Sequence, residues 1–142
     1  MTKTRLEAFS DGVLAVAITL LVLDLHADAN GETSLLQQIR HEWPSFAAYL
    51  LSFFVVGVIW VNHHALFALA KAVDRRILFY NLVLLFFVST IPFTTSSLAS
   101  FLEVDGWDNN RTAVVLYGVS MEGMSLGFTL MLRHLLKAGL TI

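Results

Sequence analysis

The sequence predicts an all-α membrane protein with four transmembrane helices arranged as a bundle. Of its 142 residues, 56% are hydrophobic and only 14% are charged, and the mean hydropathy is +0.70. Soluble domains usually carry about 25% charged residues. Four segments are each apolar enough, and long enough as helices, to cross a hydrocarbon layer of about 30 Å. Because lipid offers no hydrogen bonds to the backbone, these segments must be helical.

The expected spans cover about residues 6–25, 44–70, 77–102 and 112–132, and they form one transmembrane domain over residues 1–142. The second and third spans carry no formal charge, and Glu122 alone interrupts the fourth. In the loop before the second span, residues 34–43 have the apolar spacing of a short amphipathic helix. The loop 103–111 is expected to turn at Asp108-Asn109-Asn110.

The basic residues predict the orientation of these spans. Seven of them fall on one side of the predicted topology, whereas only Arg40 and Arg111 fall on the other. The seven are Lys3, Arg5, Lys71, Arg75, Arg76, Arg133 and Lys137. Because basic loops stay in the cytoplasm, both termini are expected inside and the protein is expected in the plasma membrane.

Ser10 and Asp11 lie near the inner end of the first span, where ionisable groups are costly unless they are paired or hydrated. One interpretation is a functional polar contact. The alternative is a helix N-cap, since Ser and Asp cap helices and acids favour a helix N-terminus.

The same span carries an apolar stripe at Val16, Leu20 and Leu23, with the small residues Gly12 and Ala15 close beside it. If several copies of this helix surrounded an axis, the stripe would form stacked apolar rings, and such constrictions can gate or filter ions. The alternative is an ordinary surface that faces lipid or packs against a neighbour.

A family resemblance favours the interpretation of the apolar stripe as the lining of a pore. The pattern Arg5-x-x-x-Phe9-Ser10-Asp11 and the apolar run 12–23 resemble the signature of the transmembrane protein 175 family, which contains lysosomal and prokaryotic potassium channels. The stretch 60–67 (WVNHHALF) and Ile91-Pro92-Phe93-Thr94 resemble the family as well. The resemblance runs along about residues 5–100.

The resemblance implies a homotetramer in which the first helix of each subunit lines a central pore that conducts potassium ions, without any cofactor. It implies pore-lining roles for Val16 as the narrowest ring, Leu20 and Leu23 as further rings, and Thr19 as a polar contact for the ion. It also implies a structural polar network made of Arg5, Ser10, Asp11, Trp60, Asn62, His63 and His64. The resemblance further implies that selectivity resides in the first helix rather than in a backbone-carbonyl filter, and the filter sequence TVGYG is absent here.

Two departures from the family pattern matter. Family members usually have six spans, whereas this sequence contains four. Position 16 is Val where Ile or Leu is commoner, and the shorter side chain is expected to widen the constriction.

Other polar residues suggest alternatives. His63 and His64 are adjacent and point about 100° apart on a helix, so they do not form the zinc pair of the i, i+4 type, and no metal site or enzyme is expected. A proton-coupled transporter using Glu122 and the two histidines is the second candidate function. An accessory membrane protein without transport activity is the third.

Overall fold

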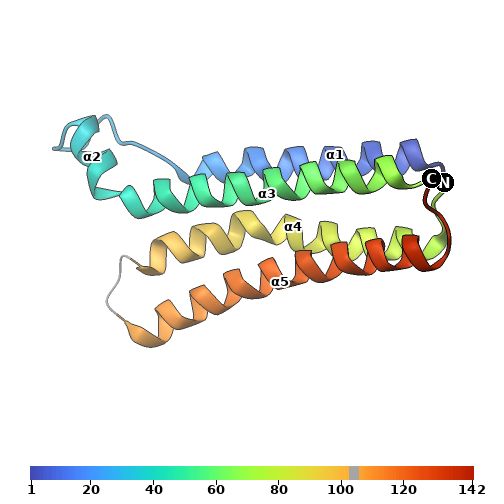
Figure 1. Ribbon diagram of the computed structural model, residues 1–142. Helices are drawn as coiled ribbons and strands as arrows, with labels where there is room; N and C mark the ends of the chain where they lie inside the picture. Colours follow the sequence, from blue (N-terminus) through green and yellow to red (C-terminus); the bar gives the residue numbers. More distant parts are fainter. Residues whose placement is uncertain (103–105) are drawn as a thin grey trace.

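The computed structural model describes residues 1–102 and 106–142. The main elements formed by these residues are all helices (Figure 1). The elements are α1 (Lys3–Leu20), the 3-10 helix η1 (Leu21–Asp24), α2 (Leu35–His41), α3 (Trp43–Leu69), α4 (Arg75–Leu102) and α5 (Trp107–Lys137). Four of these helical stretches, α1 with η1, α3, α4 and α5, are long and apolar enough to cross a membrane. The predicted all-α class with four spans is therefore confirmed.

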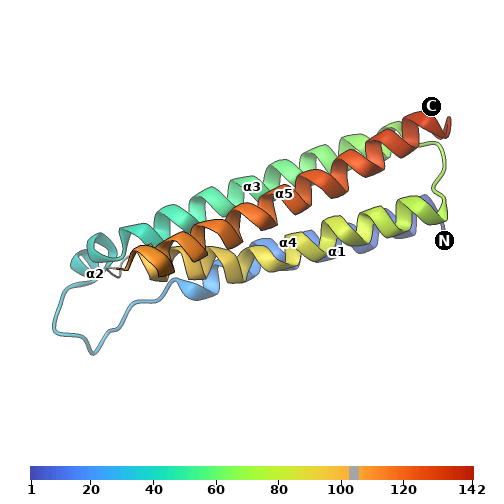
Figure 2. The same cartoon turned by 90° about the horizontal axis from the view of Figure 1, so that it is seen from below.

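The four long helices lie side by side in an elongated bundle (Figures 1 and 2). Both chain termini lie at one end of the bundle, which we call the N/C end, and α2 lies at the other, which we call the α2 end. The seven basic residues that the sequence assigned to one side lie in the elements of the N/C end. Arg40 and Arg111 lie in α2 and at the start of α5, at the α2 end.

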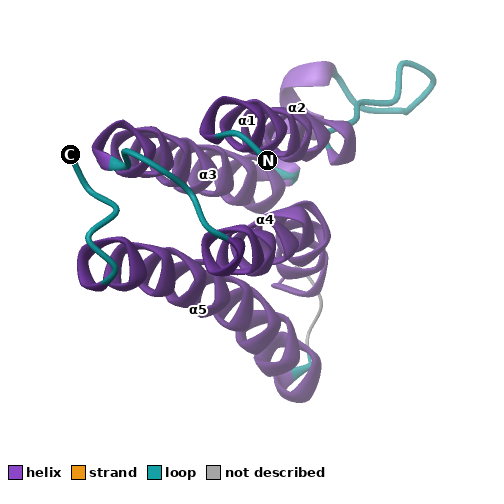
Figure 3. Ribbon diagram, turned by 90° about the vertical axis from the view of Figure 1, so that its right-hand side faces the viewer, coloured by secondary structure: helices purple, strands orange, loops and turns teal. Residues whose placement is uncertain are grey.

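Helix α4 is the element that packs against α1, α3 and α5 (Figure 3). Its contact with α5 is close because Gly127 has no side chain: a Cβ atom there would lie 2.8 Å from the backbone nitrogen of Leu84. Within one chain, the core therefore centres on α4, with fully buried Leu84, Val88 and Ile91. The expected central place of the first helix concerns an assembly of several chains, and it stays a prediction.

The helix starts depend on side-chain caps. Thr2 is the N-cap of α1 and accepts a hydrogen bond from the amide of Arg5 at 3.3 Å. Ser10 and Asp11 lie more than a turn inside this helix, so their interpretation as N-caps was wrong. Asp74 caps α4 by accepting a hydrogen bond from the amide of Ile77 at 2.9 Å. Ser34 caps the expected short helix α2 through a capping box.

The expected turn at residues 108–110 was wrong. These residues lie in the first turn of α5, where the amide of Asn110 donates to the carbonyl of Gly106 at 3.0 Å. The Thr112 hydroxyl donates to the carbonyl of Asp108 at 2.9 Å and supports the same turn. Residues 103–105 of the expected loop lie outside the described residues.

Candidate functional site

One face of α1 is buried in the bundle, and the opposite face is left exposed by the residues that the structure describes. The buried face consists of Leu6, Ser10, Leu14, Ala17 and η1 residue Leu21, spaced three or four residues apart. On the other side, Val16 is 56% exposed, Leu20 is 43% exposed and Leu23 is 69% exposed. The bundle therefore fixes α1 by one stripe and leaves the predicted pore stripe open.

The open side of α1 borders two grooves. Val16 and Leu20 line a groove of about 460 Å³ between α1 and α4, whose far wall includes Ser89. Thr19 lines a second groove, of about 260 Å³, between α1 and Trp60 of α3. The Thr19 hydroxyl shares its hydrogen between the carbonyls of Ala15 and Val16, each at 3.0 Å. Its oxygen lone pairs are left free to contact a cation.

A buried hydrogen-bonded chain joins α1, α4 and α3. Ser10 donates its hydroxyl proton to the carbonyl of Leu6 at 2.8 Å and accepts a hydrogen bond from the Asn81 amide nitrogen at 2.9 Å. The Asn81 amide oxygen lies 2.8 Å from His63 Nε2. Ser10, Asn81 and His63 are all fully buried.

These hydrogen bonds determine which ring nitrogen of His63 carries a proton. Because Ser10 spends its only proton on Leu6, it must accept from Asn81, and the Asn81 amide nitrogen therefore faces Ser10. The Asn81 oxygen then faces His63, whose Nε2–H must donate. The other nitrogen, Nδ1, is buried with no hydrogen-bond partner among the described residues.

Two further contacts join α1 to α3 at the more accessible edge of their interface. The Asp11 carboxylate accepts a hydrogen bond from the Trp60 indole at 3.1 Å, and the Glu7 carboxylate lies 3.3 Å from His64 Nδ1. The rings of Trp60 and His64 stack with their centroids 6.3 Å apart. Because Glu7 and Asp11 are four residues apart, as are Trp60 and His64, each pair occupies one face of its helix.

Five of the seven residues expected in the polar network therefore lie together. Arg5 and Asn62 do not: both are exposed, and neither side chain makes a hydrogen bond or ion pair within residues 1–102 and 106–142. Asn62 instead lines an apolar groove between α3 and α5. The roles proposed for these two residues stay predictions.

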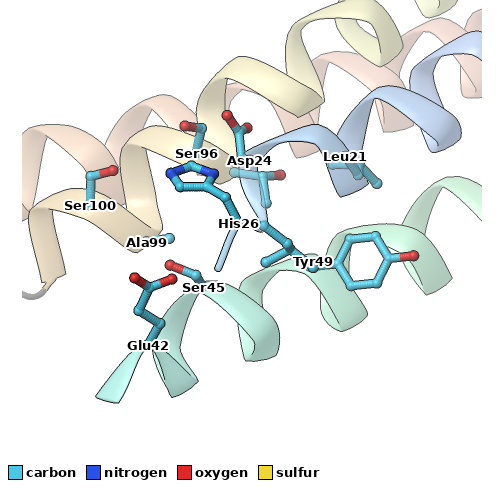
Figure 4. Close-up of a pocket in the computed structure, with 11 residues that line it drawn as sticks. Leu21, Asp24, His26, Glu42, Ser45, Tyr49, Ser96, Ala99 and Ser100 are labelled. Carbon is cyan, nitrogen blue, oxygen red and sulfur yellow. The ribbon is translucent and has the colours of Figure 1, made fainter. Parts of the chain in front are cut away.

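A polar cavity of about 190 Å³ lies at the α2 end, where η1, α3 and α4 meet. Figure 4 shows the His26 ring here, near Asp24 and Ser96, with Glu42 and Ser45 also on the wall. In the part of the chain that the structure describes, no group of three or more His, Asp or Glu side chains could hold a metal ion. The cavity accordingly offers polar surface without a metal-binding cluster.

Comparison with known proteins identifies the family. The family model described as endosomal/lysosomal potassium channel TMEM175 matches residues 5–92, which is more than half of the chain. The chain belongs to the TMEM175 family. The matched residues include the whole of α1 from Arg5 onward and every member of the Ser10–Asn81–His63 chain. Because this family model describes an ion channel, the expectation that the chain is not an enzyme is confirmed.

Individual TMEM175 relatives agree with this assignment. A protein of Streptomyces collinus named as a potassium channel is 43% identical over 136 residues, which are 95% of this chain and 65% of the relative. The crystal structure of a lysosomal potassium-selective channel TMEM175 homolog from Chamaesiphon minutus matches with a TM-score of 0.84. That match has 34% sequence identity and covers 97% of this chain and 74% of the other.

A chicken protein named as an endosomal/lysosomal proton channel TMEM175 is 35% identical over 112 residues, which are 72% of this chain and 22% of the relative. The chain thus spans less than two thirds of the length of the curated TMEM175 relatives that it matches.

Asn81 and Glu7 are the site residues that the expected polar network of this TMEM175 chain omitted. The sequence does indicate a role for Asn81, because it is a lone amide in the apolar first half of the third span. Polar side chains in such a position usually hydrogen-bond across to another helix. The partners became identifiable only when the fold placed Asn81 between Ser10 and His63.

Proposed function

We propose that this chain is a subunit of a potassium-conducting channel in the plasma membrane, with α1 of several copies lining a shared pore. The observation that carries the proposal is the one-sided burial of α1. A helix that the bundle holds by Leu6, Leu14 and Ala17 presents Val16 and Leu20 outward in a fixed orientation. Membership of a family described as a potassium channel supports the same function.

The proposed assembly is a homotetramer. Four copies of α1 around an axis would place Val16, Leu20 and Leu23 as successive apolar rings, with the Thr19 oxygen beside them. Such rings control passage through the wetting of a narrow apolar segment, and a hydroxyl oxygen replaces part of the water shell of the ion. Potassium is the permeant ion, and the mechanism requires no cofactor.

The buried polar chain is proposed to fix the position of α1. Its three side chains come from α1, α3 and α4, and a rotation of α1 about its own axis would break the hydrogen bond between Ser10 and Asn81. Because unpaired polar groups in a bundle core are costly, such a rotation is opposed. The contacts of Asp11 with Trp60 and of Glu7 with His64 act in the same direction.

The proposed orientation places the N/C end in the cytoplasm. Seven basic residues lie in the elements of that end and two lie at the α2 end, which is the asymmetry that the positive-inside rule describes. Both termini would then be cytoplasmic, and the polar cavity with Asp24 and Glu42 would face the outside.

The direct test is ion flux from liposomes that contain the purified protein. Val16→Asn should raise potassium flux because the constriction wets more easily, and Val16→Trp should block it. Val58 is the matched control, since it is 57% exposed on α3, two residues from the Trp60 that contacts Asp11. Val58→Asn and Val58→Trp should leave flux unchanged. Equal flux in all four variants would remove Val16 from the pore.

Proton conduction is the second candidate, because the chicken relative is named as a proton channel. The same liposomes test it when a pH gradient replaces the potassium gradient. A proton-coupled carrier built on Glu122 and the histidine pair has less support. Glu122 is exposed on α5, which packs on α4, whereas His63 contacts Asn81 and His64 contacts Glu7.

A further inference from the structure

Three parts of the chain that are distant in the sequence are tied together at the N/C end. The amide of Lys71 donates to the carbonyl of Leu140 at 2.8 Å, and the amide of Ile142 donates to the carbonyl of Leu69 at 2.9 Å. The Lys3 ammonium of α1 donates to the carbonyl of Ala70 at 2.8 Å. We call residues 69–74 and 134–142, together with Lys3, the terminal clasp.

One ionisable pair closes the terminal clasp. His134 Nε2, near the end of α5, lies 2.6 Å from Asp74 Oδ2, in the link between α3 and α4. The other carboxylate oxygen of Asp74 accepts the hydrogen bond that caps α4. The Asp74 side chain is 40% exposed and that of His134 is 14% exposed, so water and protons reach the pair from the surface.

The charge state of the pair is set by histidine. Hydrogen bonds from the Ile77 amide and from His134 hold the pKa of the Asp74 carboxyl below its usual range. Asp74 is therefore an anion throughout the range in which histidines gain or lose their charge, about pH 5 to 8. A neutral ring already donates a hydrogen bond to this carboxylate, and a protonated His134 adds the attraction between opposite charges, which at a partly exposed pair contributes about 0.2–1 kcal/mol.

The other groups around His134 do not offer a competing acid. From α4, the ring of Tyr80 lies edge-on with its centroid 6.0 Å from that of His134. Asp74 is the only carboxylate that contacts His134 among the described residues, and Glu7, an acid in the first turns of α1, lies against His64 of α3 instead. The basic residues of this end are Lys3, Arg5, Lys71, Arg75, Arg76, Arg133 and Lys137.

We propose that the terminal clasp is a pH-sensitive latch, which protonation of His134 tightens and deprotonation loosens. The latch connects the end of α5 to the start of α1, because the backbone segment that pairs with residues 140–142 also binds Lys3 through Ala70. It does not depend on ion conduction.

Amide hydrogen exchange on the purified protein tests the latch. After correction for intrinsic exchange rates, protection of peptides covering residues 69–72 and 138–142 should fall by up to about fivefold between pH 5.5 and pH 8. His134→Gln and Asp74→Asn keep a hydrogen-bonding group but remove the charge, and Asn also caps helices well. Both variants should lose the pH dependence. His41→Gln, on α2, is the control and should retain it.

Two outcomes would overturn the proposal. One is wild-type protection of these peptides that does not change with pH. The other is a fall that persists in His134→Gln. Unchanged protection in the middle of α4, around Val88, shows that each variant is folded, so a general loss of structure is distinguishable from an open latch.

Discussion

His63 Nε2 donates a hydrogen bond to the Asn81 amide oxygen over 2.8 Å, and both side chains are fully buried between α3 and α4. The direction of this bond follows from Ser10, which donates its hydroxyl proton to the backbone carbonyl of Leu6 and so must accept from Asn81. A single amide thus joins three helices, with its two ends facing different partners.

Replacing Asn81 with Leu should destabilise the folded chain by about 1–3 kcal/mol, because the buried His63 Nε2–H loses its partner. Thermal unfolding in detergent micelles measures the change. Asn62→Leu is the matched control, since Asn62 is exposed on the same helix as His63, and its effect should be within about 0.5 kcal/mol. Equal effects of the two variants would contradict the network.

Gly127→Ala should separate α4 from α5. The added Cβ would lie 2.8 Å from the Leu84 nitrogen and 2.9 Å from its Cα, and backbone atoms cannot move aside as a flexible side chain does. The expected cost is about 1–3 kcal/mol. At Gly118 a Cβ meets nothing within 4 Å, so Gly118→Ala should be neutral or stabilising by up to about 1 kcal/mol. Unfolding curves that show the reverse order would be inconsistent with this packing.

The orientation can be tested with single cysteines, because the natural chain has none. Ala72 and Asn30 are both exposed, at the N/C end and in the loop that leads to α2, respectively. A maleimide that does not cross membranes should label Asn30→Cys on intact cells and should label Ala72→Cys only after the cells are opened. The opposite pattern would place the termini outside.

The α4 cap should depend on pH in the acid range. The pKa of Asp74 lies below its usual value of 3.8, chiefly because the Ile77 amide donates a hydrogen bond to the ionised carboxylate. The stability that this carboxylate contributes is therefore present above its unfolded pKa and is lost as the pH falls through the folded one. The difference in unfolding temperature between wild type and Asp74→Ala should shrink from pH 5 to pH 2. A constant difference would show that the cap does not need the charge.

The four spans were predictable because length and hydropathy alone decide whether a segment crosses a bilayer. The residues at which the helices begin and end were harder to predict. α1 begins at Lys3 rather than Leu6, and α5 extends from Trp107 to Lys137, because Thr2 supplies a cap outside the apolar run and Thr112 supports the first turn of α5. Such contacts are local and polar, and hydropathy does not register them.

The site residues of α1 could be predicted from the sequence, whereas the residues that they contact on other helices could be predicted only in part. The motif and the period of the helix distinguished Ser10 from Val16, and the structure places them on buried and exposed faces, respectively. Asn81 and the pairing of Asp74 with His134 required the fold, since 71 residues separate Asn81 from Ser10 and 60 separate Asp74 from His134. No pattern within one helix specifies such partners.

In the proposed pore, copies of α1 meet around one axis through their exposed stripe. Disulfide cross-linking in membranes measures this directly, with Val16→Cys compared with Val58→Cys, which have nearly equal exposure in one chain. Mild oxidation should give covalent dimers for Val16→Cys and none for Val58→Cys. Monomeric Val16→Cys, fully labelled by a thiol reagent and never cross-linked, would show that α1 faces lipid and would contradict the proposed pore.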